Sequence, residues 1–260
     1  MSKYQHKKRF GQHFLHDGYV IDLIVKAINP QAEDPVLEIG PGLGALSFPL
    51  LRHLDHLTVI EIDRDVISTL QRKGGDNITI HNVDALRTDI SKLQTADNRP
   101  LRIVGNLPYN ISSPLIFHLL ENAGIIADMH FMLQKEVVDR IVATPGGKQY
   151  GRLSVMVQYF CQCESLLEVP PASFDPPPAV DSAVVRLIPQ QRQQPAQDVS
   201  LLSKVVAQAF SQRRKTLRNT LKKLLSSDEL IALNIDPGLR AENLAVDDFI
   251  AISNRLFADA

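Results

Sequence analysis

The sequence predicts an α/β protein in which a mostly parallel sheet, with an antiparallel hairpin at one edge, precedes a small C-terminal all-helical domain. Three observations support this fold class. Strand-like and helix-like segments alternate from about residue 18 to residue 190, which is typical of a parallel sheet covered on both faces. Residues 189–195 are polar, rich in glutamine and bounded by prolines, as in a linker. Beyond them, the apolar residues follow helical spacing only.

Each expected strand is a short apolar segment bounded by turn residues or charges. In chain order these segments are residues 36–40, 57–63, 78–81, 101–105, 129–133, 154–160 and 182–188. Helical spacing between them, as at Val66, Ile67 and Leu70, indicates the helices that connect parallel strands. The last two segments have no clear helix between them, so we expect them to form the edge hairpin.

The region after the linker predicts helices alone. Apolar spacing indicates one or two amphipathic helices between residues 202 and 225 and further helices at 228–233 and 246–257. Asp236-Pro237-Gly238 is a turn between them. We therefore expect one domain over residues 1–190 and a second over 191–260. The second domain, with about 70 residues, is small enough to need the first for support.

Composition indicates a soluble cytoplasmic protein. Of the 260 residues, 44% are hydrophobic and 22% are charged, as in ordinary globular domains. No apolar run reaches the 18 residues of a membrane span, and the basic N-terminus lacks the apolar stretch of a secretory signal. The two cysteines, Cys161 and Cys163, are two residues apart on one expected strand face. We expect two reduced thiols and no metal site, because two cysteines are too few for structural zinc.

Positive charge is concentrated although the formal net charge is −1. Residues 199–227 contain no Asp or Glu, and the N-terminal tail is basic as well. Such a local patch is typical of contact with a polyanion, whereas a solvated helix face is the alternative interpretation. The basic residues are Lys3, Lys7, Lys8 and Arg9 in the tail and Lys204, Arg213, Arg214, Lys215, Arg218, Lys222 and Lys223 in the window.

A glycine-rich loop follows the first expected strand. Glu38-Ile39-Gly40-Pro41-Gly42-Leu43-Gly44-Ala45 lies where that strand meets the next helix, and its glycines allow a tight turn against a ligand. Glu61 ends the second strand, 21 positions after Gly40, where an acidic residue can accept both hydroxyls of a ribose. This pair of features fits NAD and S-adenosylmethionine equally well.

Two further strand ends favour methyl transfer over redox chemistry. Asp84 follows the third strand, where its carboxylate can accept a hydrogen bond from an adenine amino group. Asn106-Leu107-Pro108-Tyr109 follows the fourth strand. The Asn106 oxygen can accept a hydrogen bond from an exocyclic amine, the residue before Pro108 is extended and can aim a carbonyl at it, and Tyr109 can stack on a base. A turn with a buried tyrosine is the alternative. No residue set for hydride transfer is evident.

Five motifs in order resemble the ribosomal RNA adenine dimethyltransferases, and most closely the bacterial enzymes of the small subunit. Four of them run from Gly11 to Leu15, from Glu38 to Gly44, from Glu61 to Asp63 and from Asn106 to Ser112. The fifth runs from Phe174 to Ser182. The resemblance covers nearly the whole chain. It implies a Rossmann-like class I methyltransferase sheet and a helical domain that contacts RNA.

The resemblance also implies the activity and its participants. It implies that S-adenosylmethionine methylates the exocyclic amines of two adjacent adenosines near the 3′ end of 16S rRNA, in a small-subunit precursor particle. Cofactor contacts are implied at His13, Leu15, Gly40, Glu61, Asp84 and Asn106, and Gly42 joins them from the glycine loop. Asn106, the Leu107 or Pro108 carbonyl and Tyr109, with Phe174 as a second stacking residue, are expected to hold the base. The family usually has Asn at the position of His13, so a solvent-facing histidine is the alternative there.

Two other functions remain open at this point, and both keep the same fold. A DNA adenine methyltransferase often carries a similar loop with Pro in place of Leu107, but about 70 helical residues leave little room for reading a major groove. A ribosome-assembly factor could use the fold for binding alone. We expect a monomer, since no long exposed apolar stripe is evident in the sequence.

Overall fold

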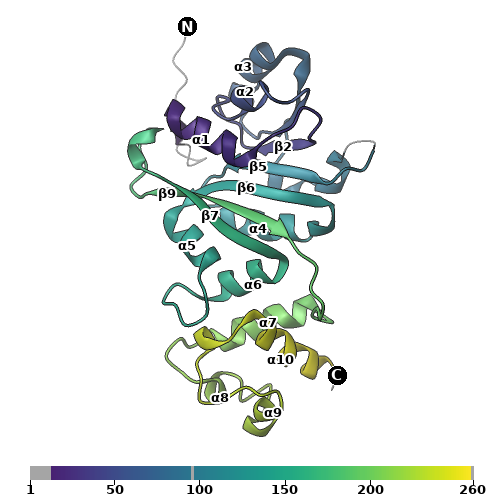
Figure 1. Cartoon of the computed structure of the whole chain (residues 1–260), viewed down its shortest axis with the longest axis vertical. Helices are drawn as coiled ribbons and strands as arrows, with labels where there is room; N and C mark the ends of the chain where they lie inside the picture. The colour runs from purple at the N-terminus through teal and green to yellow at the C-terminus, as the bar shows by residue number, and fades with distance from the viewer. Residues whose placement is uncertain (1–12, 95–96, 259–260) are drawn as a thin grey trace. The chain divides into compact units, whose positions relative to one another are not determined.

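The computed structural model describes residues 13–94 and 97–258, which form two compact units (Figure 1). The first unit consists of the described residues up to Val138 together with Glu164–Pro189. The second consists of Asp139–Cys163 and the described residues from Gln190 onward. The chain passes from the first unit to the second after Pro189, close to residue 190, where we placed the domain boundary. Residues 139–163, which we expected in the first domain, belong to the second unit.

The first unit contains a seven-stranded sheet in the order β4-β3-β2-β5-β6-β9-β7. The β2–β3, β3–β4, β2–β5 and β5–β6 pairs are parallel, and β9 is antiparallel to β6. This arrangement confirms the predicted fold class. The strands are β2 (Val36–Ile39), β3 (Leu57–Ile60), β4 (Ile78–His81), β5 (Leu101–Asn106), β6 (Ile126–Gln134), β7 (Cys161–Val169) and β9 (Ser182–Pro189).

Strand β2 lies between β3 and β5, so the chain order reverses at its carboxyl end. Ligands of open parallel sheets bind at such a switch point. The residues that follow these strands, Gly40, Glu61 and Leu107, therefore meet at one edge of the sheet. The topology alone brings together the loops that the sequence analysis singled out.

Helices cover this sheet, and apolar burial holds them in place. Residues of α1, α2 and α3 form one buried cluster with strand residues such as Val36, Val59 and Val104. Helix α4 buries Leu115 and Leu119 outside that cluster, as expected of a helix on the opposite face. The helices of this part of the chain are α1 (Gly18–Ile28), α2 (Ser47–Leu50), α3 (Arg64–Gly74), α4 (Ser112–Leu120) and α5 (Lys135–Val142), the last ending in the second unit.

One predicted strand is wrong. Residues 154–160 belong to helix α6 (Arg152–Phe160), and the strand that we expected there is β7, which begins at Cys161. Ser154 stabilises the first turn of this helix, because its hydroxyl accepts a hydrogen bond from the Gly151 amide (3.0 Å) and donates one to the Arg140 carbonyl (2.5 Å). Every position from 155 to 157 is apolar, so the segment shows neither the helical period of 3.6 residues nor the strand period of 2. From the sequence alone, a short buried helix of this kind cannot be distinguished from a buried strand.

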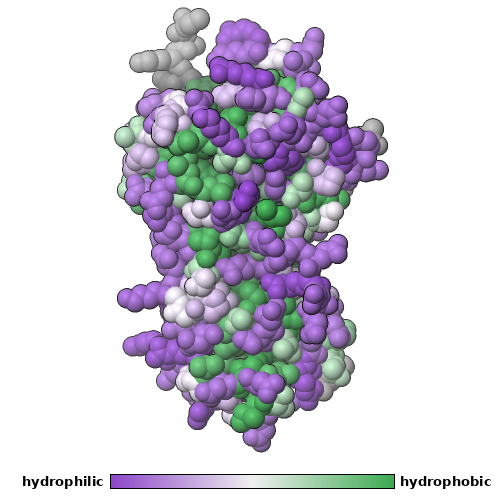
Figure 2. All heavy atoms as spheres, in the orientation of Figure 1, coloured by the Kyte–Doolittle hydropathy of each residue, from purple (hydrophilic) through white to green (hydrophobic). Residues whose placement is uncertain are grey.

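The second unit is helical, as expected. Its core contains three aromatic rings: Phe210 contacts Tyr150 edge-on on one side and stacks on Phe249 on the other. Hydrophilic side chains form most of the face drawn in Figure 2, with apolar side chains scattered between them. The helices of this unit are α6, α7 (Val199–Ala209), α8 (Leu217–Thr220), α9 (Ser227–Ala232) and α10 (Val246–Ala258). No helix in the described part of the chain is long and apolar enough to cross a membrane.

A two-stranded sheet outside the main one fixes the start of the described chain. Strand β1 (Phe14–Leu15) pairs antiparallel with β8 (Phe174–Asp175). Asp17 then caps helix α1, because its carboxylate accepts hydrogen bonds from the Tyr19 and Val20 amides. The Ser173 hydroxyl donates to the same carboxylate at 3.0 Å. These contacts join the N-terminal segment to the Phe174–Ser182 motif.

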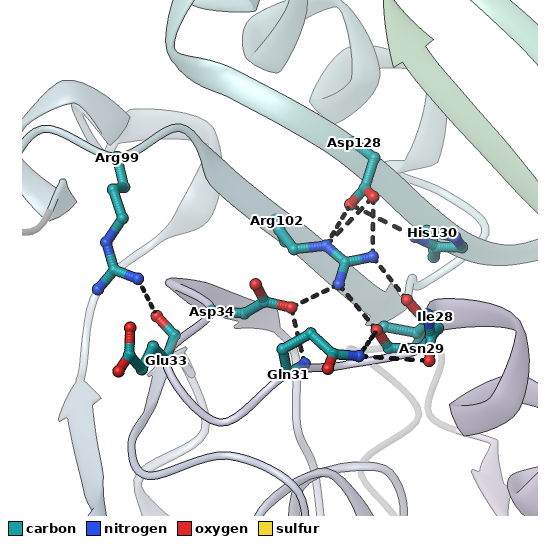
Figure 3. A network of polar contacts seen from close by, with 9 residues as sticks. All are labelled: Ile28, Asn29, Gln31, Glu33, Asp34, Arg99, Arg102, Asp128 and His130. Carbon is teal, nitrogen blue, oxygen red and sulfur yellow. Dashed lines mark hydrogen bonds and ion pairs between the residues drawn. The ribbon is translucent and has the colours of Figure 1, made fainter.

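The amino ends of β5 and β6 carry a polar network around Arg102 (Figure 3). The guanidinium pairs with Asp34 at 2.6 Å and with Asp128 at 2.8 Å, and it donates to the Ile28 carbonyl at 2.6 Å. Those contacts hold the last turn of α1 against β5. Buried His130 lies 3.7 Å from Asp128, and neither ring nitrogen has a hydrogen-bond partner among the described residues.

We predict that His130 makes the fold sensitive to acid. The pKa of His130 is lowered from 6.5 to about 4, mainly by burial and also by the positive charges of Arg102 and Arg186, although Asp128 opposes them. The unfolded chain therefore binds the proton first, so stability is lost as pH falls from about 6.5 to about 4.

Replacing His130 with Leu should flatten this part of the stability profile, by on the order of 3 kcal/mol at most. Urea unfolding of both proteins between pH 4 and pH 7.5 provides the measurement. Parallel stability curves for wild type and variant would show that His130 does not cause the acid sensitivity.

Candidate active site

The predicted site residues other than Phe174 gather around one cavity at the carboxyl ends of β2, β3 and β5. Its volume is about 240 Å³. Every residue predicted to contact the cofactor lines it, as does the whole Asn106-Leu107-Pro108-Tyr109 loop. The cofactor residues in question are His13, Leu15, Gly40, Gly42, Glu61, Asp84 and Asn106. All of them belong to the first unit.

The glycine loop needs its glycines for two different reasons. Gly40 and Gly42 have φ angles of 71° and 53°, a region that L side chains rarely adopt. A Cβ atom at Gly42 would also lie 3.0 Å from the Phe14 ring, so the loop and the N-terminal segment approach closely. The Gly40 amide donates to the Ile60 carbonyl at 2.9 Å, which fixes the loop to the end of β3. The result is a rigid turn along one wall of the cavity.

Glu61 joins that loop to its own strand end. Its carboxylate accepts hydrogen bonds from the Gly42 amide at 3.1 Å and from the Asp63 amide at 2.8 Å. Burial raises the pKa of Glu61, while these two amides act in the opposite direction. Each carboxylate oxygen keeps a further lone pair, so Glu61 can still accept hydrogen bonds from a ligand hydroxyl.

A second buried carboxyl, Glu38, also lines the cavity, and the sequence analysis gave it no role. The Ser47 hydroxyl donates to it at 2.5 Å. The pKa of Glu38 is raised to about 7, mainly by burial and also by the charge of Glu61, while the Ser47 hydrogen bond acts in the opposite direction. An acidic residue inside the apolar segment 36–40 was the available signal, because a glutamate is rarely fully buried unless it is paired.

A carboxylate, Asp84, and two apolar side chains line the cavity as well. Asp84 accepts a hydrogen bond from the Leu86 amide at 3.0 Å and lies 3.7 Å from Arg87. Ile62 and Val83 line the same cavity and are 49% and 42% exposed, unusually high for large apolar residues. Sequence reasoning missed both, because they look like ordinary residues after a strand. Their exposed apolar surfaces thus border the same cavity as the Asp84 carboxylate.

Asn106 is oriented by a contact with the N-terminal segment. Its side-chain nitrogen donates to the His13 carbonyl at 3.1 Å. Because only the nitrogen of a carboxamide can donate, this bond leaves the side-chain oxygen as an acceptor. The Pro108 carbonyl accepts from the Ile111 amide at 3.1 Å, whereas the Leu107 carbonyl accepts no backbone hydrogen bond from the described residues. Of the two carbonyls left open by the sequence, Leu107 is therefore the freer acceptor.

Tyr109 is half-buried, and its position is fixed at its far end. The phenol forms a hydrogen bond of 2.7 Å with the hydroxyl of Ser182, which is fully buried. Burial raises the pKa of Tyr109, while the Ser182 hydrogen bond lowers it. The His13 ring stacks on Tyr109 with 5.8 Å between ring centroids and 25° between planes. His13 is thus half-buried, with its ring against a residue that lines the cavity.

Phe174 does not lie where we expected it. Its side chain is 2% exposed, belongs to the buried core and does not line the cavity. Pairing of β1 with β8 places Phe174 opposite Leu15 and turns its ring into the core. The expected stacking of Phe174 on a base is therefore wrong for this conformation. The Phe174–Ser182 motif instead supports the site through β1 and through Ser182.

The basic residues of the C-terminal window lie at the surface of the second unit. Arg213 is held by Glu242 at 3.4 Å and by the Lys148 carbonyl. Six basic side chains of this window are exposed and form no ion pair with another described residue: Lys204, Arg214, Lys215, Arg218, Lys222 and Lys223. The tail residues Lys3, Lys7, Lys8 and Arg9 lie outside the described residues. No group of His, Cys, Asp and Glu suited to a metal ion occurs within the described ranges.

We predict a pH dependence of stability from Glu38. Its folded-state pKa of about 7 exceeds the ordinary 4.5, so the folded protein binds the proton more tightly. The contribution is fully present below about pH 4.5 and is lost as pH rises through about 7. Glu38→Gln should therefore gain stability over wild type between pH 5 and pH 8, on the order of 3 kcal/mol. Thermal and urea unfolding across this range test it. An unchanged difference between the two proteins would mean that Glu38 ionises normally.

Comparison with known proteins identifies the family. Residues 3–258 match the family described as ribosomal RNA adenine dimethylase. The chain is 57% identical to ribosomal RNA small subunit methyltransferase A of Chromobacterium violaceum, over 98% of this chain and 97% of that protein. The protein of the same name from Alcanivorax borkumensis is 54% identical, over 98% and 91%.

Solved structures agree with this assignment. A dimethyladenosine transferase from Plasmodium falciparum aligns with a TM-score of 0.79 and 29% identity, over 92% of this chain and 96% of that one. The 23S rRNA methyltransferase ErmE aligns with a TM-score of 0.70 and 26% identity, over 94% and 99%. The predicted enzyme class is confirmed, and the DNA methyltransferase alternative is not favoured. This chain belongs to the ribosomal RNA adenine dimethylase family.

Proposed function

We propose that this protein transfers methyl groups from S-adenosylmethionine to the exocyclic amines of two adjacent adenosines near the 3′ end of 16S rRNA. It acts in the cytoplasm, as a monomer, on a precursor particle of the small subunit. The observation that carries the proposal is the oriented Asn106 carboxamide, whose free oxygen borders the same cavity as Glu61 and Asp84. A hydrogen-bond acceptor for an amine therefore lies beside the carboxylates that could bind a nucleoside.

The cavity residues fit S-adenosylmethionine. Glu61 would accept the ribose hydroxyls, Ile62 and Val83 would cover the adenine, and Asp84 would accept its amino group. The glycine loop would pass close to the remaining chain of the donor. When bound, the donor supplies a methyl group on a positively charged sulfur. Two buried carboxyls, Glu38 and Glu61, favour such a cation in the cavity.

The acceptor amine needs orientation more than it needs a base. Its lone pair is delocalised into the purine, and two hydrogen bonds, to the Asn106 oxygen and the Leu107 carbonyl, favour a pyramidal nitrogen. Stacking on Tyr109 sets the plane of the base, with roughly 1–3 kcal/mol per stacked base. Correct positioning can lower a barrier by about 7–11 kcal/mol. The product cation is acidic and loses its proton to water or a neighbouring group.

The same hydrogen bonds set the number of transfers. The amine has two N–H groups, and each transfer replaces one of them. After the first transfer one N–H remains to hold the base against Asn106 or Leu107. After the second none remains, so the doubly methylated base is no longer held and the reaction ends.

The exposed basic residues would recognise RNA through its phosphates and its shape. A target adenine must leave its stack to reach the cavity, which costs a few kcal/mol in a duplex and less in a loop. The exposed Arg214, Lys215, Lys222 and Lys223 in the second unit supply phosphate contacts. A protein with a net charge of −1 would otherwise have little general affinity for RNA.

We predict that Asn106→Ala lowers methyl transfer to unmethylated small subunits by at least about a hundredfold, because positioning of the amine is lost. Donor affinity, measured by calorimetry, should change little. Glu61→Ala is the matched control, and it should weaken donor binding instead. Nucleoside analysis after incubation with labelled donor reports singly and doubly methylated adenosine. Full dimethylation by Asn106→Ala would remove the amine-holding role from this residue.

We predict that exposed Arg214 and Lys215 contribute to particle binding through phosphate contacts. The double variant Arg214→Ala/Lys215→Ala should bind small subunits more weakly, with a slope of log affinity against log salt reduced by about 1.4. Lys92→Ala, which alters an exposed lysine of the first unit, serves as the control. An unaltered salt slope in the double variant would assign this surface to solvation only.

A further inference from the structure

We propose that Asn110 recognises the purine ring of the target base by donating a hydrogen bond from its side-chain nitrogen to the adenine N7 atom. This inference rests on the proposed function and deepens it, because it assigns a residue that selects adenine from among the RNA bases. The proposed contacts of Asn106 and Leu107 hold an exocyclic amine, and cytosine carries such an amine as well. A further contact is therefore needed to distinguish the two bases.

Asn110 lies beside Tyr109 on a turn whose backbone is fixed. The Ile111 amide donates to the Pro108 carbonyl at 3.1 Å, which closes a turn with Tyr109 and Asn110 at its centre. The Ser112 hydroxyl donates to the Tyr109 carbonyl at 3.1 Å and holds the same turn from the helical side. Both central residues line the cavity. Their Cα atoms are about 3.8 Å apart, as across any trans peptide, so a base stacked on Tyr109 lies within reach of Asn110.

The side chain of Asn110 is available to a ligand. It is exposed, and it forms no hydrogen bond with another described residue. The carboxamide of Asn106 differs, because its nitrogen already donates to the His13 carbonyl. Since a carboxamide nitrogen carries two N–H groups, Asn110 brings donors to a site where Asn106 and Leu107 supply acceptors. Donors and acceptors are thus divided between neighbouring residues of one loop.

One edge of adenine presents the complementary pattern of groups. Beside the N6 amine, the ring nitrogen N7 accepts a hydrogen bond, and asparagine commonly pairs with this N6 and N7 edge in DNA complexes. Cytosine has an amine but no N7, and guanine presents an oxygen in place of the amine. Asn106 and Asn110 together therefore recognise the pattern that a single asparagine recognises in a DNA groove.

The exposure of Asn110 favours N7 over N1, the other ring nitrogen beside the amine. Asn106 is half-buried and Leu107 is buried, so the amine enters the cavity first and the ribose stays toward solvent. N7 belongs to the ring that carries the ribose, whereas N1 belongs to the other ring of the purine. An exposed residue that lines the cavity therefore meets N7 before N1.

The test combines changes in the base with changes in the full-length protein. Small subunits are reconstituted with 16S rRNA that carries adenosine, 7-deazaadenosine or 1-deazaadenosine at the target positions. The two analogues replace N7 or N1 with C–H and keep the amine. We expect wild type to methylate the adenosine substrate with a kcat/KM about fivefold above that of the 7-deaza substrate, the effect of one hydrogen bond at an exposed site. The 1-deaza substrate should behave like adenosine.

Two substitutions of Asn110 complete the cycle. Asn110→Ala removes the donor, and Asn110→Asp replaces it with an acceptor of nearly the same shape. The ratio of kcat/KM between the adenosine and 7-deaza substrates should fall to about one in Asn110→Ala, because the base change and the protein change remove the same contact. It should fall below one in Asn110→Asp, since a carboxylate repels the N7 lone pair. A purely structural role of Asn110 would lower the turnover of both substrates equally and leave the ratio at its wild-type value.

The outcomes separate this inference from the proposed function. A wild-type ratio near one, an unchanged ratio in Asn110→Ala, or a loss with the 1-deaza substrate alone would overturn the role of Asn110, even where wild type dimethylates the adenosine substrate normally. The comparison of the two analogues needs only wild type, so it stands even if a substitution prevents folding. If wild type transfers no methyl group, the proposed function fails, and the same ratios are measured as affinities for these subunits with S-adenosylhomocysteine present.

Discussion

The hydrogen bond from the Asn106 side chain to the His13 carbonyl determines what the cavity can do. The bond engages the side-chain nitrogen, so the side-chain oxygen is the atom left to accept a hydrogen bond from a ligand. This bond depends on the position of the N-terminal segment. Pairing of β1 with β8 and capping of α1 by Asp17 hold that segment, and the Arg102 network holds the far end of α1 against β5. Distant parts of the chain thus cooperate in aiming one oxygen atom.

The cavity owes its second property to buried acidic groups. Glu38 and Glu61 lie at its wall, each satisfied by hydrogen bonds from Ser47 or from backbone amides. Burying two carboxyls close together costs stability, as the raised pKa of Glu38 shows. A positively charged ligand offsets that cost, so the same arrangement that weakens the empty fold favours binding of a sulfonium. Stability and affinity are therefore linked at this site.

The sequence contained enough information for the sheet and for most of the site, because both depend on local patterns. Apolar strands ending in Gly40, Glu61 and Asn106 could be recognised individually, and the switch-point rule then brought their ends together. Prediction failed where tertiary packing decides. Residues 154–160 suit a helix or a strand equally, and Phe174 turns inward only because β8 pairs with β1. The roles of Ile62 and Val83 become visible only from their exposure inside a cavity.

Asn106 and Leu107 are proposed to hold the amino group of the target adenine. A crystal structure of the protein with S-adenosylhomocysteine and a short RNA containing the target adenosine would show whether they do. We expect the adenine N6 atom within hydrogen-bond distance, about 2.7–3.2 Å, of both the Asn106 side-chain oxygen and the Leu107 carbonyl, with the ring stacked on Tyr109. An adenine bound outside the cavity, or held with its amino group directed away from Asn106, would contradict the account.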